Sequence, residues 1–374
     1  MNDSSPEVKE SGRSGNSPQP DLTTAVPIYD HSLDERKFDY ASKTIIPYLN
    51  KQSSEFRELS LLRKKGWENP KGDVYFRAQR RNADQSSEKN DIHFYNLMKK
   101  IGEELHQSSN AFKIHSRHQG GPTILDTCMA PGGFLETALK LNPHSRAVAF
   151  SLPASCGGHK IRLPRAFQVD VRHLDVTMLA ADMGVNNVPQ DHPDAHNFLP
   201  QQLGHGEAFD LVICDGQVLR THLRAPYREK VEARRLTATQ LALGLQHLRN
   251  GGTMVVLLHK LEAWNTANLI WQFTRFASVK LIKPKTGHAK RSSFYLVAKD
   301  IQNNHPEAVR NILKWKKIWQ LATFGPEAEF RKEILDDCLR VDDFIANFGP
   351  RLVELGREIW KVQADALAKA PFIK

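Results

Sequence analysis

Residues 123–141, which read TILDTCMAPGGFLETALKL, constrain the fold of this chain more than any other stretch. Three β-favouring residues lead into Asp126, the turn Ala130-Pro131-Gly132-Gly133 follows, and apolar residues then recur at helical spacing from Phe134. A strand, a glycine turn and a helix in this order form the first crossover of an open α/β sheet. Glycines at such a turn let the backbone come close to a ligand, with the start of a helix behind it.

Strands and helices continue to alternate after this crossover. Strands are predicted at residues 147–152, 166–176, 209–215, 253–259, 278–282 and 294–299, and helices at 230–248 and 268–276, with Asn250-Gly251-Gly252 as a helix stop. Alternation of this kind predicts a mostly parallel sheet with right-handed crossovers. The last two strands have no helix between them, so they are expected to be antiparallel.

The regions on either side of the α/β pattern have a different composition. Residues 1–30 are polar and rich in Ser, Pro and Gly, which predicts a disordered tail. Residues 31–115 are predicted to form a helical N-terminal region, residues 116–300 the α/β domain, and residues 301–374 a helical C-terminal extension.

The charge balance suits a polyanionic partner. Lysine and arginine number 52 against 42 acidic residues, which gives a net charge of +10 and a pI near 9.3. Residues 280–299 hold six cations and no acid, and residues 220–235 hold six more just after Asp215. These two basic stretches favour a nucleic acid as partner, although a solvated basic face is the plainer explanation for either one.

Other sequence features bear on compartment, membrane and metal. The four cysteines lie far apart without a CxxC pair, which argues for a reducing compartment and against a structural zinc site. No apolar run approaches ~18 residues and the N-terminus lacks an apolar signal, so we expect an intracellular, soluble protein of the cytoplasm or nucleus, without a membrane contact. His192 and His196 have a metal-like spacing with two nearby aspartates, but their Pro- and Asn-rich surroundings favour a plain polar loop and no metal.

Four residues mark the predicted carboxyl ends of strands, where open α/β sheets bind ligands: Asp126, Ser151, Asp215 and Lys260. Acids often cap helices and lysines often end strands, so each residue alone says little. Asp215 and Lys260 follow two successive buried strands. If those strands are neighbours, the two side chains converge at one edge of the sheet.

The order of these motifs resembles the FtsJ-like family of S-adenosylmethionine-dependent RNA 2′-O-methyltransferases over residues 97–300. The matching features are the Ala-Pro-Gly-Gly loop, Asp215 in Cys-Asp-Gly, Lys260, and Lys283-Pro284 before the final strand. The resemblance implies a Rossmann-like class I methyltransferase sheet, mostly parallel with an antiparallel last strand. It also implies S-adenosyl-L-methionine as cofactor and RNA methylation as activity.

The resemblance assigns roles to individual residues. The implied cofactor-binding residues are Asp126, Ala130, Pro131, Gly132, Gly133, Phe134, Ser151, Asp175 (with Asp170 as the alternative) and Asp215. The family uses a Lys-Asp-Lys-Glu tetrad to remove the hydroxyl proton. Lys260 matches its central lysine, Asp215 its aspartate, and Lys100 its first lysine, for which Lys99 and Lys113 are alternatives.

Two positions depart from the family pattern. Ser293 stands where the tetrad has glutamate, and Ser151 stands where the family has a ribose-binding acid. Serine carries no charge to orient a lysine, and its hydrogen bond to a hydroxyl is roughly half as strong as a carboxylate's. Three hypotheses follow: a methyltransferase acting on an RNA ribose 2′-hydroxyl, a catalytically degenerate relative that binds RNA or cofactor, or a methyltransferase for a non-RNA substrate.

Overall fold

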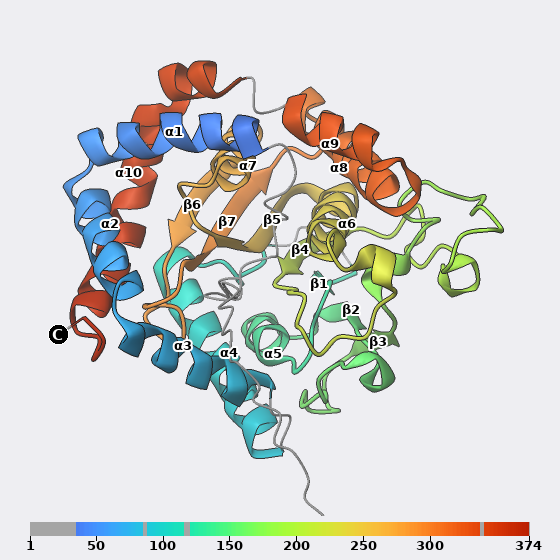
Figure 1. Cartoon of the computed structure of the whole chain (residues 1–374). Helices are drawn as coiled ribbons and strands as arrows, with labels where there is room; N and C mark the ends of the chain where they lie inside the picture. The colour runs from blue at the N-terminus through green and yellow to red at the C-terminus, as the bar shows by residue number, and fades with distance from the viewer. Residues whose placement is uncertain (1–34, 85–87, 116–119, 337–339, 374) are drawn as a thin grey trace, which may run out of the picture.

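A computed structural model describes residues 35–84, 88–115, 120–336 and 340–373 of the chain (Figure 1). Its centre is a seven-stranded sheet in the order β3-β2-β1-β4-β5-β7-β6. The strands are β1 (Thr123–Asp126), β2 (Arg146–Ser151), β3 (Val169–His173), β4 (Phe209–Cys214), β5 (Leu248–His259), β6 (Ser278–Ile282) and β7 (Ser293–Ile301). Only β7 runs antiparallel to its neighbours β5 and β6, so the predicted mostly parallel sheet with an antiparallel last strand is confirmed. The predicted tail at residues 1–30 lies outside the described residues.

Ten helices surround the sheet in the described part of the chain. They are α1 (Glu35–Gln52), α2 (Ser54–Trp67), α3 (Pro70–Asp84), α4 (Glu88–Ser109), α5 (Gly133–Leu141), α6 (Glu232–Gln246), α7 (Trp264–Phe273), α8 (Pro306–Phe324), α9 (Glu327–Asp336) and α10 (Val341–Ala368). Of these, none is both long and apolar enough to cross a lipid bilayer.

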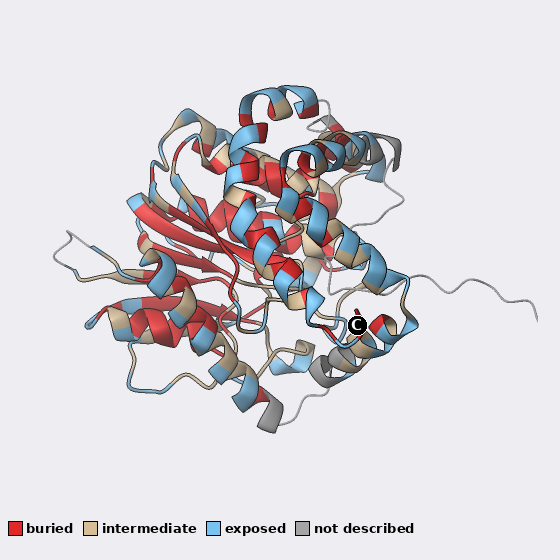
Figure 2. Ribbon diagram, turned by 90° about the vertical axis from the view of Figure 1, so that its left-hand side faces the viewer, coloured by how far each residue is buried: buried red, intermediate tan, exposed pale blue. Residues whose placement is uncertain are grey.

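Alternation along the strands divides the interior into two layers. In β7, Tyr295 and Val297 join the cluster that packs against α4 and α5, whereas Phe294 and Leu296 join the cluster under α6, α7 and α8. The two sets of helices lie on opposite faces of the sheet in Figure 1. Figure 2 shows the central strands mostly buried between them, as expected for a sheet covered on both faces, whereas the edge strands β3 and β6 are partly exposed.

Two predicted boundaries were wrong for local reasons. The third strand ends at His173, because Asp175 leaves the strand and caps a short 3-10 helix by accepting a hydrogen bond from the Thr177 amide. The Asn-Gly-Gly expected as a helix stop instead lies inside β5, where Gly251 has a φ of +83° and the pairing with the neighbouring strands shifts register. This is a β-bulge, for which a glycine is suited.

Helices from the two ends of the chain form one layer beside the sheet. Phe56 of α2 packs edge-on against Trp360 of α10 with ring centroids 5.1 Å apart. The buried cluster that contains both rings also contains residues of α1, α7, β5 and β6. The terminal helices therefore share the core of the sheet domain and do not form a separate one.

The glycine turn after β1 is packed by protein on both sides. A Cβ on Gly133 would lie 2.6 Å from the Tyr95 carbonyl oxygen and 2.7 Å from the Met98 Cβ, both on α4. Gly132 has a φ of +108°, and a Cβ there would lie 3.3 Å from the Leu163 Cβ. At Gly133 the close approach that requires glycine is to a helix of this chain, which differs from the expected approach to a ligand.

We predict that Gly133→Ala destabilises the fold by about 1–3 kcal/mol, because the added methyl group overpacks the contact between α5 and α4. Gly206→Ala is the matched control, since a Cβ at Gly206 meets no atom within 4 Å. The free energies of unfolding from urea denaturation check this. Equal stability of the two variants would contradict the packing argument.

Candidate active site

Parallel pairing brings the expected strand-end residues to one edge of the sheet. Asp126 ends β1 and pairs with Ile213 of β4, so Asp215 follows two residues beyond on the neighbouring strand. β4 in turn pairs with β5, and Lys260 follows directly after β5. The condition set by the sequence, that the strands before Asp215 and Lys260 are neighbours, is met.

Two carboxyl groups lie on this edge, that of Asp126 buried and that of Asp215 partly buried. Burial raises the pKa of Asp126 to about 7, although its Oδ1 accepts a hydrogen bond from the Cys128 amide. Burial also raises the pKa of Asp215 to about 8, and the charge of Asp126 adds to the effect. Neither carboxyl forms an ion pair with another described residue. The edge therefore holds two acids that lack a cation.

Tyr295 is a site residue that the sequence analysis missed. Its hydroxyl donates a 2.9 Å hydrogen bond to Asp215 Oδ1, and its ring packs against Phe134 and His288. The signal was present in the alternation of the last strand, because residues 293 and 295 share one face. The bond engages one carboxylate oxygen of Asp215.

Lys260 occupies an unusual backbone position. Its φ is +48°, in the left-handed region that residues other than glycine rarely adopt. Its amide donates to the Ser292 carbonyl, and its own carbonyl accepts from the Ala263 amide at 2.8 Å, which closes a turn. In the described part of the chain, its ammonium has no hydrogen-bond or ion-pair partner. Burial lowers the pKa of Lys260. Such strain at a partly buried lysine is typical of functional sites.

The start of β7 holds no acid. Ser293 is 2% exposed and its Oγ lies 2.6 Å from His288 Nδ1. Its carbonyl accepts a 2.8 Å hydrogen bond from Lys283, which also donates to the Arg291 carbonyl. Burial lowers the pKa of Lys283 to about 7. Lys283 is thus committed to backbone oxygens, whereas Lys260 is not.

At the end of β2, the Ser151 hydroxyl is buried and has no hydrogen-bond partner in the structure. The two candidate acids, Asp175 just after β3 and Asp170 within β3, are both engaged. Asp175 accepts from Thr177 and pairs with Arg228 at 2.7 Å, and Asp170 is exposed and pairs with Arg172 at 2.7 Å. Of these three side chains, Ser151 alone is buried with its polar group unpaired.

The three candidates for the first lysine lie in different surroundings. Lys100 is on the exposed face of α4, turned away from the face that carries Met98 against α5. Lys99 pairs with Glu136 at 3.1 Å, and Lys113 donates to the Leu141 carbonyl. The structure thus brings none of them to Asp215 and Lys260 through an observed contact.

Sequence comparison gives the family. The model of the FtsJ-like methyltransferase family matches residues 102–301, which is more than half of the chain. This chain belongs to the FtsJ-like methyltransferase family. Its sheet is therefore a Rossmann-like methyltransferase sheet, and S-adenosylmethionine is the cofactor. No curated protein matches the chain.

Several solved methyltransferase structures are similar at low identity. An rRNA methylase from Streptococcus thermophilus is 13% identical and matches 53% of this chain and 97% of its own, with a TM-score of 0.29. The N-methyltransferase NodS from Bradyrhizobium japonicum is 15% identical over 54% of this chain and 97% of its own, with a TM-score of 0.33. NodS in complex with S-adenosyl-l-homocysteine has a TM-score of 0.32, at 15% identity over 53% and 84% of the two chains. Similarities of this size carry no argument about the substrate.

The residues of the edge fit this cofactor. S-adenosylmethionine is a sulfonium cation with ribose hydroxyls, and the edge offers two acids without a cation, one buried and one partly buried, and an unpartnered serine hydroxyl. The N-cap residue Gly132 provides no side-chain acceptor for the first turn of α5, as at helix starts that bind carboxylates. No three His, Cys, Asp or Glu side chains are placed to hold a metal ion within the described ranges, and the His192 ring packs on Phe198 and Tyr227.

We predict that the ratio of two affinities, that for S-adenosylmethionine over that for S-adenosylhomocysteine, rises between pH 6 and 9. The sulfur of S-adenosylhomocysteine carries no charge. A cation favours the ionised carboxylates, and below about pH 7 to 8 these must first lose a proton. The ratio should rise by up to about tenfold per pH unit for each carboxyl that ionises. Calorimetric titration of both ligands measures it, with Asp215→Asn reducing the slope. A flat ratio would show that these acids do not face the sulfonium.

Proposed function

We propose that this protein transfers a methyl group from S-adenosylmethionine to a ribose 2′-hydroxyl of RNA, with Lys260 as the base. The proposal depends on the position and environment of Lys260. It is a partly buried lysine in a strained backbone conformation, without a bond to another described side chain. It follows β5, which is the neighbour of the strand that precedes Asp215.

The cofactor would be held along the ends of β2, β1 and β4. Asp126 and Asp215 supply negative charge, Ser151 a hydroxyl, and residues 130–134 the backbone of the turn and the start of α5. Asp175 would contribute only by accepting a further bond, because both of its oxygens already have partners. When bound, S-adenosylmethionine supplies a methyl group that is already activated by the sulfonium.

Lys260 would take the proton of the ribose hydroxyl as the hydroxyl oxygen bonds to the methyl carbon and the bond between methyl and sulfur breaks. This requires the neutral amine. Burial lowers the pKa of Lys260, and the positive charge of Arg63 lowers it further, while Glu262 raises it. The rate should therefore rise as the pH increases through this pKa, since only the deprotonated lysine accepts a proton. We leave Lys100 out of the catalytic group because of its exposed position on α4.

RNA as substrate is supported by part of the basic surface. Lys285 and Arg291 are exposed in the loop between β6 and β7, and Lys290 lies over the Tyr75 ring at 5.2 Å. The stretch at residues 220–235 contributes less than its charge suggests. Arg228 and Arg235 are buried and pair with Glu232, each at 2.8 Å. These two arginines are engaged inside the fold and are not available to phosphates.

We predict that Lys260→Ala lowers kcat for methyl transfer to RNA by about 10²–10⁴-fold and leaves the affinity for S-adenosylmethionine nearly unchanged. Transfer of labelled methyl groups to bulk RNA measures the rate. Alkaline hydrolysis then tests the site of transfer, because a 2′-O-methyl group protects the adjacent phosphodiester. Lys361→Ala is the matched control, since Lys361 is an exposed lysine of α10 that pairs with Asp365.

Other outcomes separate the alternatives. Cofactor binding without transfer to RNA would favour either the degenerate binding protein, as the loss of acids at Ser151 and Ser293 suggests, or a methyltransferase for another substrate. Transfer that is equally fast in Lys260→Ala would remove Lys260 as the base.

A further inference from the structure

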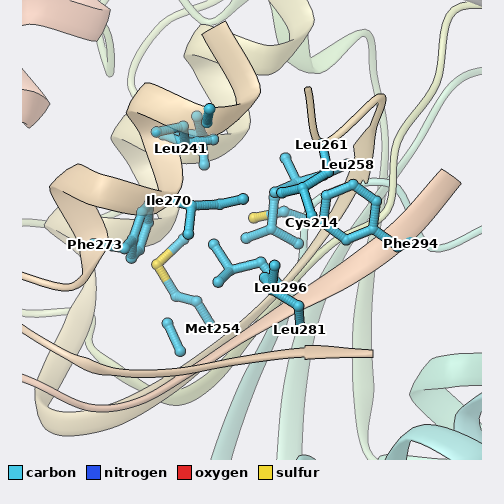
Figure 3. Close-up of a cluster of buried hydrophobic side chains, with 14 of the residues drawn as sticks. Cys214, Leu241, Met254, Leu258, Leu261, Ile270, Phe273, Leu281, Phe294 and Leu296 are labelled. Carbon is cyan, nitrogen blue, oxygen red and sulfur yellow. The ribbon is translucent and has the colours of Figure 1, made fainter. Parts of the chain in front are cut away.

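The family's acid is missing at Ser293, but another carboxylate lies next to Lys260. Glu262 follows Lys260 by two residues in the turn between β5 and α7. Leu261, which stands between them, is buried in the apolar cluster that contains side chains of α7 and β7 (Figure 3). The turn is thus anchored at its centre, and the two charged side chains flank the anchor.

Glu262 is nearly buried and only half satisfied. Only 9% of the surface of this residue is exposed. Its Oε1 accepts a 2.7 Å bond from Arg63 Nη1, while its Oε2 is buried without a hydrogen-bond partner in the structure. A buried carboxylate oxygen without a donor is costly, so this atom has the capacity to accept a bond from a nearby cation.

Arg63, which bonds Glu262, belongs to the helices that flank the sheet. It lies on α2, and its Nη2 donates to Gln363 Oε1 of α10 at 3.0 Å. A helix from each end of the chain therefore contributes to the position of Glu262. This contact gives the terminal helices a direct connection to the turn that carries Lys260.

We propose that Glu262, held by Arg63, is the positioning residue for Lys260 and supplies the carboxylate that is absent at Ser293. The inference rests on the proposed function of Lys260 as the base. When the hydroxyl O–H bond breaks and the proton moves to Lys260 Nζ, the Glu262 carboxylate stabilises the ammonium that forms.

The charges around Lys260 are consistent with this role. The charged and titratable groups that face it are Glu262, which raises the pKa of Lys260, Arg63, which lowers it, and His259, whose own pKa burial lowers to about 4. His259 is therefore neutral where a lysine titrates. Glu262 also raises the pKa of Lys283, and Arg63 also lowers it.

The test uses opposite shifts in the pKa of Lys260, which a merely structural role would not produce. Glu262→Gln should lower this pKa by about one unit, because an adjacent negative charge is lost. Arg63→Gln should raise it, because a cation is lost, and Arg63→Lys should move it less. Arg357→Gln is the control, since Arg357 joins α10 to Glu55 of α2 at 3.6 Å without contacting Glu262.

Two measurements on the full chain follow the shift. One is the pH dependence of kcat/KM for methyl transfer to RNA. Its acidic limb should move to lower pH for Glu262→Gln and to higher pH for Arg63→Gln. The other is the pH dependence of Lys260 acetylation by acetic anhydride, read by peptide mass spectrometry, which needs neither cofactor nor RNA. Thermal unfolding of each variant reports on the fold.

The two proposals fail in different ways. A wild type that transfers no methyl group to RNA would overturn the proposed function, while opposite shifts in the acetylation profile would still support the pairing of Glu262 with Lys260. Acetylation profiles of Lys260 that coincide in wild type, Glu262→Gln and Arg63→Gln would overturn the role of Glu262. If Glu262→Gln does not fold, the comparison of Arg63→Gln with Arg63→Lys decides.

Discussion

The parallel pairing of β4 with both β1 and β5 is the constraint on which the site depends. Parallel strands end at the same edge, so the residues that follow them lie along that edge wherever they stand in the sequence. Asp126, Asp215 and Lys260 come from three such strands. Tyr295 reaches the same edge from the antiparallel strand β7 and holds Asp215 by a hydrogen bond.

Burial then gives these groups their chemistry. Carboxyl groups removed from water without a cation favour the neutral form, which is why the pKa values of Asp126 and Asp215 are raised. A cationic ligand at this edge restores their charge and gains from it. A lysine in the same setting is shifted in the other direction, toward the neutral amine that accepts a proton.

The terminal helices are part of this arrangement. Their apolar faces complete the core on the side of β6 and α7, and the contact between Arg63 and Glu262 extends them to the turn after β5. The fold therefore combines a sheet that collects strand ends with flanking helices that set the charge near one of them. Other basic residues that look like a surface stretch, such as Arg228 and Arg235, serve ion pairs inside the fold.

The sequence by itself determined the α/β alternation, most strand positions to within a few residues, and the strand-end candidates Asp126, Ser151, Asp215 and Lys260. These follow from local periodicity and from residues next to one another in the chain. Only the tertiary structure decided that Gly133 accommodates α4, that Tyr295 bonds Asp215, and that Arg63 reaches Glu262 across 199 residues. Contacts between distant segments depend on how the helices and strands pack. The hydrophobic period of one segment does not specify which other segment it will contact.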